Sequence, residues 1–167
     1  RSFKIRGAYQ KIHSLNTSDR KKGIVCASAG NHAQGVAYSC SILNIEATIF
    51  VPENTPPQKI KSIEKFSNEK CKLQVVGKNF DEAYQISMEY CRKYNKTYVH
   101  PFNDIDVIHG QGTVAVEIYN KIKPDIIIVC VGGGGLLSGI TIYSKYMNAS
   151  CQLYGVESVN CNSMYQS

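Results

Sequence analysis

Short runs of β-branched and other apolar residues alternate along this chain with longer segments in which apolar residues recur at helical spacing. The short runs predict buried strands, and the longer segments predict amphipathic helices. The predicted strands are Ile24–Ala27, Ala47–Val51, Lys72–Val76, Thr97–Val99, Ile126–Val131 and Gln152–Val156. The predicted helices are His32–Leu43, Pro57–Phe66, Phe80–Tyr94, Ile108–Ile122 and Leu136–Tyr146.

Local signals support these boundaries. Pro57 suits the first position of a helix, and Asn79 followed by Asp81 and Glu82 reads as a helix cap with acidic residues in the first turn. Alternating strands and helices predict an α/β fold, with parallel twisted sheets covered by helices on both faces. Ile126–Val131 is apolar at every position, which predicts a central parallel strand.

Composition places the chain among soluble globular proteins. Its 167 residues are 43% hydrophobic and 19% charged, which suits one domain or two small ones. Its longest apolar run falls short of the roughly 18 residues of a membrane span, so no membrane partner is expected. The charge of +6 is mild, and the basic clusters at Arg20–Lys22 and Arg92-Lys93 lack interleaved aromatics, so no nucleic-acid partner is expected.

The cysteines and the first residue bear on localisation. Seven cysteines are an odd number, and no C-x-x-C occurs. Cys26, Cys40, Cys71 and Cys130 stand in or beside apolar stretches, where cysteine behaves as a small hydrophobe. We therefore expect free thiols in a reducing compartment, the cytoplasm. The chain opens on Arg1 with no visible signal, so an organelle matrix stays open if a transit peptide has been lost.

Gly132–Gly135 follows the most apolar predicted strand and precedes a helix. Backbone N–H groups of such a loop, with the helix N-terminus behind them, suit a phosphate. A tight turn is the plainer alternative. A dinucleotide pyrophosphate is another, because the run forms a loose G-x-G-x-x-G variant ending at Ser138, and Glu157 lies where a ribose-binding acid would.

A polar loop, Ser28–His32, leaves the first predicted strand. Gly30 allows a sharp turn, Ser28 and Asn31 offer hydrogen-bonding side chains, and the helix amides that follow suit a carboxylate. The alternative is an ordinary helix cap at Asn31. Both loops lie at carboxyl ends of parallel strands, where ligands bind in such sheets.

Lys4, between Phe3 and Ile5, has two interpretations. It can extend along a helix surface with its amine in water. Buried beside a cofactor, its amine would have a lowered pKa and form a Schiff base with an aldehyde.

Two further segments carry weaker signals. His100–Asn103 ends a predicted strand at the same sheet edge and reads as a plain turn, with a substrate pocket as the alternative. Gly110 and Gly112, placed at or just inside a helix start, indicate close approach to another backbone or a domain hinge.

In combination, five motifs resemble those of one family. They are Ser2–Ala8, Ala27–Gly35, His109–Thr113, Val131–Leu136 and Tyr154–Glu157. The chain resembles the fold type II enzymes that use pyridoxal 5'-phosphate, specifically threonine dehydratase and its serine dehydratase and serine racemase relatives. This resemblance implies a threonine ammonia-lyase that also acts on L-serine, with small amino acids as substrates and a homo-oligomeric assembly.

The resemblance also implies residue roles. Lys4 would hold pyridoxal phosphate covalently and act as acid and base at the substrate α-carbon. Phe3 would stack on the cofactor ring, and Asn31 would hydrogen-bond its phenolic oxygen. The phosphate would be bound by backbone amides of Gly132, Gly133, Gly134, Gly135 and Leu136. The substrate, through its carboxylate, would be bound by the loop of Ser28, Ala29, Gly30, Asn31 and His32.

Two departures from the family pattern bear on activity. Racemases have a serine at the position of Ala29, and alanine has no proton to give, so dehydration is favoured over racemisation. Some relatives bind a divalent cation near the glutamate that matches Glu157, with a second acid a few residues on. Here Asn160, Asn162 and Ser163 follow instead, so no metal is expected, although Glu157 alone remains able to supply one ligand.

Full members of the family are roughly twice as long as this chain, so we expect a fragment that lacks the start and the C-terminal half. The expected division is residues 1–22 as a large-domain segment with the cofactor lysine, 23–103 as the small α/β domain and 104–167 as part of the large domain. A serine racemase or dehydratase, a catalytically incomplete fragment and a dinucleotide-binding domain remain as alternatives.

Overall fold

The computed structural model describes residues 2–167, so Arg1, the first residue of the expected segment 1–22, lies outside the described part. None of the helices in residues 2–167 is both long enough and apolar enough to cross a bilayer. The elements run in this order: α1 (Lys4–Ser14), α2 (Thr17–Lys22), β1 (Ile24–Ala27), α3 (Asn31–Leu43), β2 (Ala47–Val51), α4 (Pro57–Phe66), β3 (Cys71–Val75), α5 (Phe80–Lys93), β4 (Thr97–Tyr98), α6 (Ile105–Tyr119), β5 (Ile126–Cys130), α7 (Gly135–Met147), β6 (Gln152–Val156) and α8 (Ser163–Gln166).

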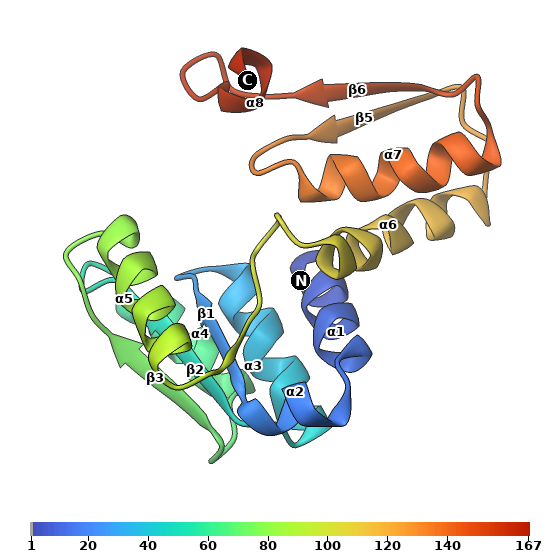
Figure 1. The fold of residues 1–167 in the computed structure, drawn as a ribbon. Coiled ribbons are helices and arrows are strands. Elements are labelled where there is room, and N and C mark those ends of the chain that lie inside the picture. Colours follow the sequence, from blue (N-terminus) through green and yellow to red (C-terminus); the bar gives the residue numbers. More distant parts are fainter. Residues whose placement is uncertain (1) are drawn as a thin grey trace.

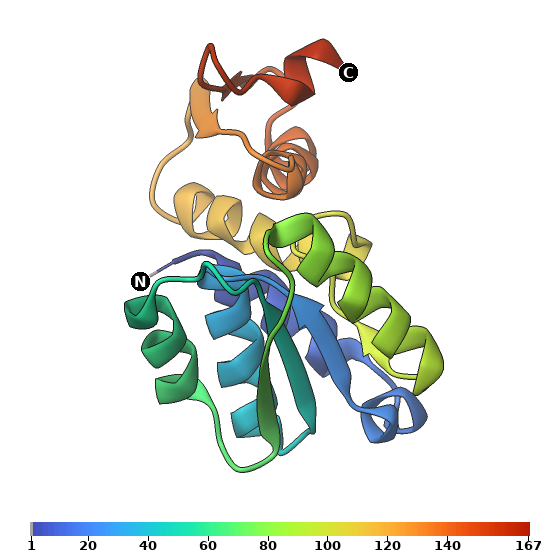
Figure 2. The ribbon, with the colours of Figure 1, turned by 90° about the vertical axis from the view of Figure 1, so that its left-hand side faces the viewer.

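A four-stranded parallel sheet has the strand order β3-β2-β1-β4, with Ile24 paired to Ala47 on one side and to Thr97 on the other. Helices α3 and α4 cover one face and α5 covers the other (Figure 2). Every residue of β1 and β2 is buried, which is the pattern of central strands in a sheet covered on both faces. The predicted α/β architecture is confirmed for this sheet.

The second sheet consists of β5 and β6, paired in parallel. Helices α6 and α7 lie together on one side of it (Figure 1). Ile127 and Val129 are buried there, whereas Ile126 and Ile128 are 54% and 69% exposed on the opposite face. The prediction of β5 as a central strand covered on both faces is therefore wrong for the described residues, because helices cover one face and β6 is the one strand paired with it.

Helix α1, which the sequence pattern did not predict, lies between α3 and α6 (Figure 1). Glycines of both neighbouring helices allow this close packing: a Cβ at Gly110 of α6 would lie 2.4 Å from the Arg6 carbonyl oxygen, and one at Gly35 of α3 would lie 3.1 Å from the Ile5 Cα. The predicted close approach of another backbone to Gly110 is thus confirmed. Ala8 and Ile12 of α1 are fully buried in the core that includes β1 and β2.

Most boundaries agree with the prediction to within three residues. Asn79 caps α5 by accepting a hydrogen bond from the Glu82 amide at 3.0 Å, as expected. Helix α6 begins three residues earlier than predicted, because Asp104 caps it through the amides of Asp106 and Val107. Helices α2 and α8 were not predicted.

All seven cysteines are free thiols. Cys26 and Cys40 are buried as expected, and Cys71 is partly buried. Cys130 is exposed, which corrects the expectation that it fills an apolar site. The reason is its position on β5, where it shares the uncovered face of the small sheet with Ile126 and Ile128.

Candidate active site

Five segments that are far apart in the sequence line two adjoining cavities. One cavity, ≈ 260 Å³, is lined by Cys130, Val131, Leu137 and the loop Gly132–Leu136. The other, ≈ 360 Å³, is lined by Ala27, Ser28, Asn31, His32, Phe80 and Pro101. Phe3, Lys4, Phe102 and Gly133 line both. Lys4 therefore stands in a wall shared by the two predicted ligand loops.

The Lys4 amine is held inside this site. Its Nζ donates a hydrogen bond to the carbonyl oxygen of Pro101 at 2.7 Å, and it lies 5.5 Å from the ring centre of Phe3 and 6.0 Å from that of Phe102. Burial lowers the pKa of Lys4. A lowered pKa raises the fraction of neutral amine near pH 7, and the neutral amine is the nucleophile. The Lys4 amine is therefore half-buried in the wall of the two cavities.

The glycine loop leaves β5 and enters α7. The first backbone hydrogen bond of that helix runs from the Ser138 amide to the Gly134 carbonyl at 2.9 Å, so the amides before Ser138 stand outside the helical ladder. Gly134 has φ +79°, a left-handed conformation that favours glycine. A Cβ at Gly133 would lie 2.3 Å from the Cγ of Phe102, while one at Gly132 would meet nothing within 4 Å.

This loop fits a phosphate. It lines a cavity with backbone in place of side chains, and the N-terminus of a 13-residue helix lies directly behind it. Gly134, with its positive φ, also suits the tight turn that was the alternative interpretation. The phosphate-binding loop and the tight turn are therefore the same loop.

The Ser28–His32 loop leaves β1 and enters α3. The helix cap is Gly30, and Asn31 is the first helical residue, with no side-chain capping hydrogen bond at this terminus. The alternative of Asn31 as an ordinary cap is therefore wrong. Ser28 Oγ accepts a hydrogen bond from the Gly30 amide at 3.2 Å, which fixes the loop. The exposed Asn31 amide is available to a ligand.

His32 lies behind this loop with 2% of its surface exposed. The Val99 carbonyl can only accept, so Nε2 donates the hydrogen bond of 2.9 Å between them, and Nδ1 has no protein partner. Burial lowers the pKa of His32 to about 4, so the ring is neutral near pH 7. The hydrogen bond of His32 therefore connects α3 to the residue that follows β4.

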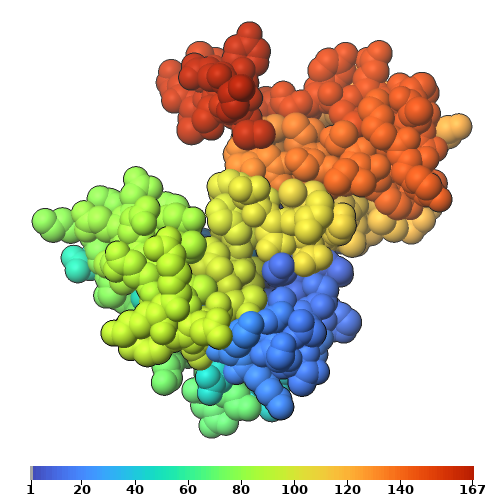
Figure 3. Space-filling view, in the orientation of Figure 1, coloured from blue at the N-terminus to red at the C-terminus, as the bar shows by residue number. Residues whose placement is uncertain are grey.

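The segment after β4 contributes more than its sequence indicated. His100 Nδ1 accepts hydrogen bonds from the amides of Phe102 and Asn103, at 3.3 and 2.8 Å, so the segment does form a turn. The same turn presents the Pro101 carbonyl to Lys4 and the Phe102 ring to both cavities. In Figure 3 the yellow part of the chain, which includes this segment, lies between the light-green α5 and the red C-terminal part. Its position at the carboxyl end of a strand was the signal for a pocket.

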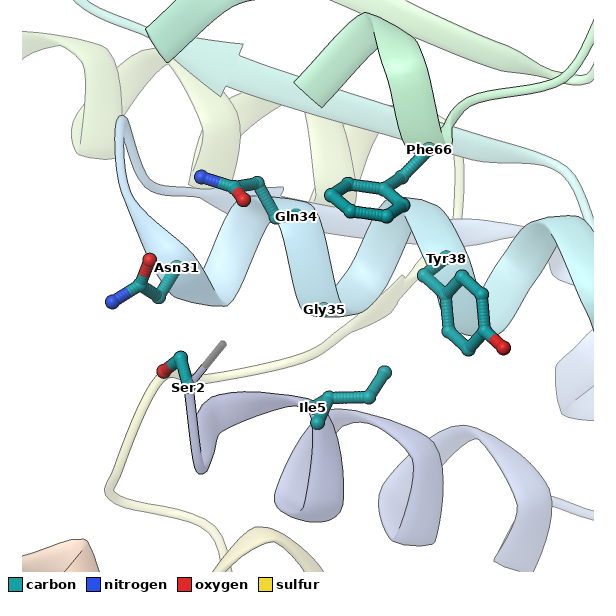
Figure 4. Close-up of a pocket in the computed structure, with 7 residues that line it drawn as sticks. All are labelled: Ser2, Ile5, Asn31, Gln34, Gly35, Tyr38 and Phe66. Carbon is teal, nitrogen blue, oxygen red and sulfur yellow. The ribbon is translucent and has the colours of Figure 1, made fainter. Parts of the chain in front are cut away.

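A third cavity, ≈ 220 Å³, adjoins the site through Asn31. Figure 4 shows Asn31 and Ser2 at one end and Tyr38 and Phe66 at the other, with Ile5 of α1 facing α3. The rings of Tyr38 and Phe66 meet edge to face with centroids 5.9 Å apart. Asn31 thus stands between the cavity that contains Lys4 and a second, largely apolar cavity.

Glu157 has a local role in the described chain. Its carboxylate accepts hydrogen bonds from the amides of Met164 and Tyr165, at 3.1 and 2.9 Å, and so holds the start of α8. Across residues 2–167, no three histidine, cysteine or acidic side chains gather into a group that could hold a metal ion.

Comparisons with known proteins agree on one family. The family described as "Pyridoxal-phosphate dependent enzyme" matches residues 1–167. The chain is 45% identical to the biosynthetic L-threonine dehydratase IlvA of Bacillus subtilis, over 100% of the chain and 40% of that protein. It is 46% identical to the enzyme of the same name from Lactococcus lactis, over 98% of the chain and 41% of that protein. The chain therefore spans about two fifths of the length of these relatives.

Solved structures have the same fold. The processed form of threonine deaminase isoform 2 from Solanum lycopersicum superposes with a TM-score of 0.94 at 38% identity, over 99% of this chain and 48% of that one. Serine racemase from Dictyostelium discoideum superposes with a TM-score of 0.90 at 31% identity, over 99% of this chain and 53% of that one.

Proposed function

The chain belongs to the pyridoxal-phosphate dependent enzyme family, in its fold type II branch, and from this premise we propose that it is part of a threonine ammonia-lyase. The enzyme would convert L-threonine to 2-oxobutanoate and ammonia, and L-serine to pyruvate and ammonia. The observation that carries the proposal is the Lys4 amine, half-buried in the wall common to the cavities of both ligand loops.

Several residues of this chain would bind the cofactor, each at a different part of it. Lys4 Nζ would hold pyridoxal phosphate covalently, and Phe3 would pack against the ring. The amides of Gly132–Leu136 would bind the phosphate, and the Asn31 amide would donate to the phenolic oxygen. When bound, pyridoxal phosphate supplies an electron sink for negative charge at the substrate α-carbon.

On the substrate side, Ser28 and the amides of the Ser28–His32 loop would bind the carboxylate at the start of α3. Lys4 Nζ would take the proton from the α-carbon, with the Pro101 carbonyl 2.7 Å away as its hydrogen-bond acceptor. Ala29 has no proton to deliver to the opposite face of that carbon, which argues against a racemase.

The domain division remains part of the proposal. Residues 23–103 would form the small domain, supported by their own four-stranded sheet, and residues 1–22 and 104–167 would belong to the large one. The family resemblance also supports the proposals that the protein acts in the cytoplasm and assembles as a homo-oligomer.

The test is Lys4→Ala with Lys59→Ala as the matched control, because Lys59 is an exposed lysine of α4, away from the cavities. The protein, at the full length at which it occurs, is supplied with pyridoxal phosphate and L-threonine, and 2-oxobutanoate and ammonia are measured. Lys4→Ala is expected to lower the rate by at least about 10³-fold, since it removes the acid-base group, while Lys59→Ala has no effect. Equal rates in the two variants would contradict the proposal.

A further inference from the structure

In the cavity lined by the Ser28–His32 loop, part of the surface is uncharged and has no role in the proposed function. Phe3, Lys4, Ser28, Asn31, His32 and Gly133 have roles toward cofactor or substrate carboxylate, and the Pro101 carbonyl is the hydrogen-bond acceptor of Lys4. The remaining lining residues are Ala27, Phe80 and Phe102. None of these carries a charge, so a charged substrate side chain would lose its hydration there without gaining a partner. This surface suits a small, uncharged side chain.

Phe80 is the one of these residues contributed by α5. It is the first residue of that helix, directly after the cap Asn79. The turn before it requires glycine at position 77, because Gly77 has φ +76° and a Cβ there would lie 2.8 Å from the Ala83 amide nitrogen. Phe80 is 46% exposed, and it lines the cavity rather than the core.

A row of aromatic rings supports Phe80. Its ring stacks on Tyr84 with centroids 6.2 Å apart and an interplanar angle of 22°. Tyr84 lies edge-on to His100 at 6.4 Å, and His100 lies edge-on to Phe102 at 4.6 Å. The row therefore runs from Phe80 to Phe102, both of which line the cavity, and such ring contacts hold each ring in place.

From this arrangement we infer that Phe80 is a specificity-determining residue, whose ring packs against the substrate side chain and favours the methyl group of L-threonine over L-serine. The inference rests on the proposed function and adds the residue that selects between its two substrates. One methyl group in an apolar pocket changes kcat/KM by about 10-fold or somewhat more, which sets the size of the expected effect.

The experiment compares kcat/KM for L-threonine and L-serine in the full-length protein loaded with pyridoxal phosphate. The variants are Phe80→Ala, Phe80→Leu and, as the matched control, Tyr94→Ala. Tyr94 is also a half-exposed aromatic residue, placed at the other end of α5, with its ring tilted against that of Tyr90 at a centroid distance of 4.6 Å. Phe80→Ala is expected to lower the threonine-to-serine ratio about 10-fold, mainly through kcat/KM for threonine, and Phe80→Leu about 3-fold. Tyr94→Ala is expected to leave the ratio unchanged.

An unchanged ratio in Phe80→Leu, which retains an apolar side chain and the fold, would overturn the inference even if Phe80→Ala failed to fold. An equal shift in Tyr94→Ala would also overturn it, because the effect would then be a general response of α5. If the unsubstituted protein acts on neither amino acid, the proposed function itself fails. Activity of the unsubstituted protein with an unchanged ratio in the Phe80 variants contradicts the inference alone.

Discussion

The loop after β1 and the loop after β5 have the same place in the fold but face Lys4 with different chemistry. Each leaves the carboxyl end of a parallel strand and enters a 13-residue helix. The Ser28–His32 loop presents side chains: a fixed serine, an exposed asparagine and a buried histidine. The Gly132–Gly135 loop presents backbone, since a side chain at Gly133 would overlap the Phe102 ring.

The difference shows how one fold recognises two parts of a ligand. A phosphate is bound well by several amides at a helix N-terminus, and side chains would obstruct that approach. The ring oxygen and a substrate carboxylate need donors at particular points, which the side chains of Ser28 and Asn31 would provide together with the amides of the Ser28–His32 loop. Substitutions in the two loops should therefore reduce ligand binding for different reasons. In the glycine loop an added side chain should obstruct the ligand, and in the polar loop the loss of a side chain should remove a hydrogen bond.

The largest effect is expected for Gly133→Ala. The added Cβ would lie 2.3 Å from the Phe102 Cγ and 2.4 Å from its Cδ1, so the Phe102 ring, which lines both cavities, would have to shift. Overpacking of this kind costs about 3 kcal/mol at its upper end, so the affinity for pyridoxal phosphate should fall about 100-fold. Fluorescence titration of the cofactor measures this. An affinity within threefold of the unsubstituted protein would mean that the absence of a side chain at Gly133 is unimportant.

A smaller effect is expected on the free energy of unfolding, which should depend on pH through His32, the buried last residue of the Ser28–His32 loop. The pKa of His32 is about 4 in the folded protein and near 6.5 when the chain is unfolded. Between these values the unfolded chain binds a proton that the folded chain does not, so stability is retained above pH 6.5 and lost as the pH falls toward 4. At pH 5 the loss attributable to His32 is about 2 kcal/mol.

Urea unfolding at pH 7.5 and pH 5 checks this, with His32→Gln as the control. Glutamine does not titrate and can still donate to the Val99 carbonyl, while every other titratable residue is the same in both proteins. The unsubstituted chain should lose about 2 kcal/mol more than the variant between the two pH values. Equal losses would show that His32 is not buried in its neutral form.

The smallest effect is expected for Asn31→Ala. Asn31 is exposed and does not cap α3, so its loss should leave the melting temperature within about 2 °C. One hydrogen bond to the cofactor contributes about 1 kcal/mol, so the affinity for pyridoxal phosphate should fall roughly 5- to 10-fold. A large drop in melting temperature with unchanged affinity would instead assign Asn31 a structural role and weaken the contrast between the loops.

Much of the fold follows from local signals in the chain. The boundaries of β1, β2, β6 and α4 match the predicted ones, because β-branched runs, Pro57 and flanking turns act over a few residues. Helix α1 escaped prediction because its packing relies on Gly7, which looks neutral in the sequence and becomes necessary only against Val107 and Gln111 of α6. The burial of β5 failed as a prediction because an apolar run does not reveal how many helices cover it.

In the candidate site, too, the contiguous motifs could be predicted from the sequence, whereas the contacts between distant segments could not. The two loops and Lys4 could be recognised because each motif is contiguous. The contact between Lys4 and Pro101 joins residues 97 positions apart, and the row of rings from Phe80 to Phe102 depends on how α5 docks on the sheet. Pairings of this kind arise from tertiary packing, and no local pattern encodes them.

The most direct test of the account is borohydride reduction of the chain after incubation with pyridoxal phosphate, followed by peptide mapping. Because Lys4 is a lysine with a pKa lowered by burial and stands between both loops, the account predicts a pyridoxyl adduct confined to Lys4. Gly133→Ala should diminish that adduct, and Lys59→Ala should leave it unchanged. An adduct spread over exposed lysines, with Lys4 unmodified, would contradict the claim that the two loops and Lys4 form one cofactor site.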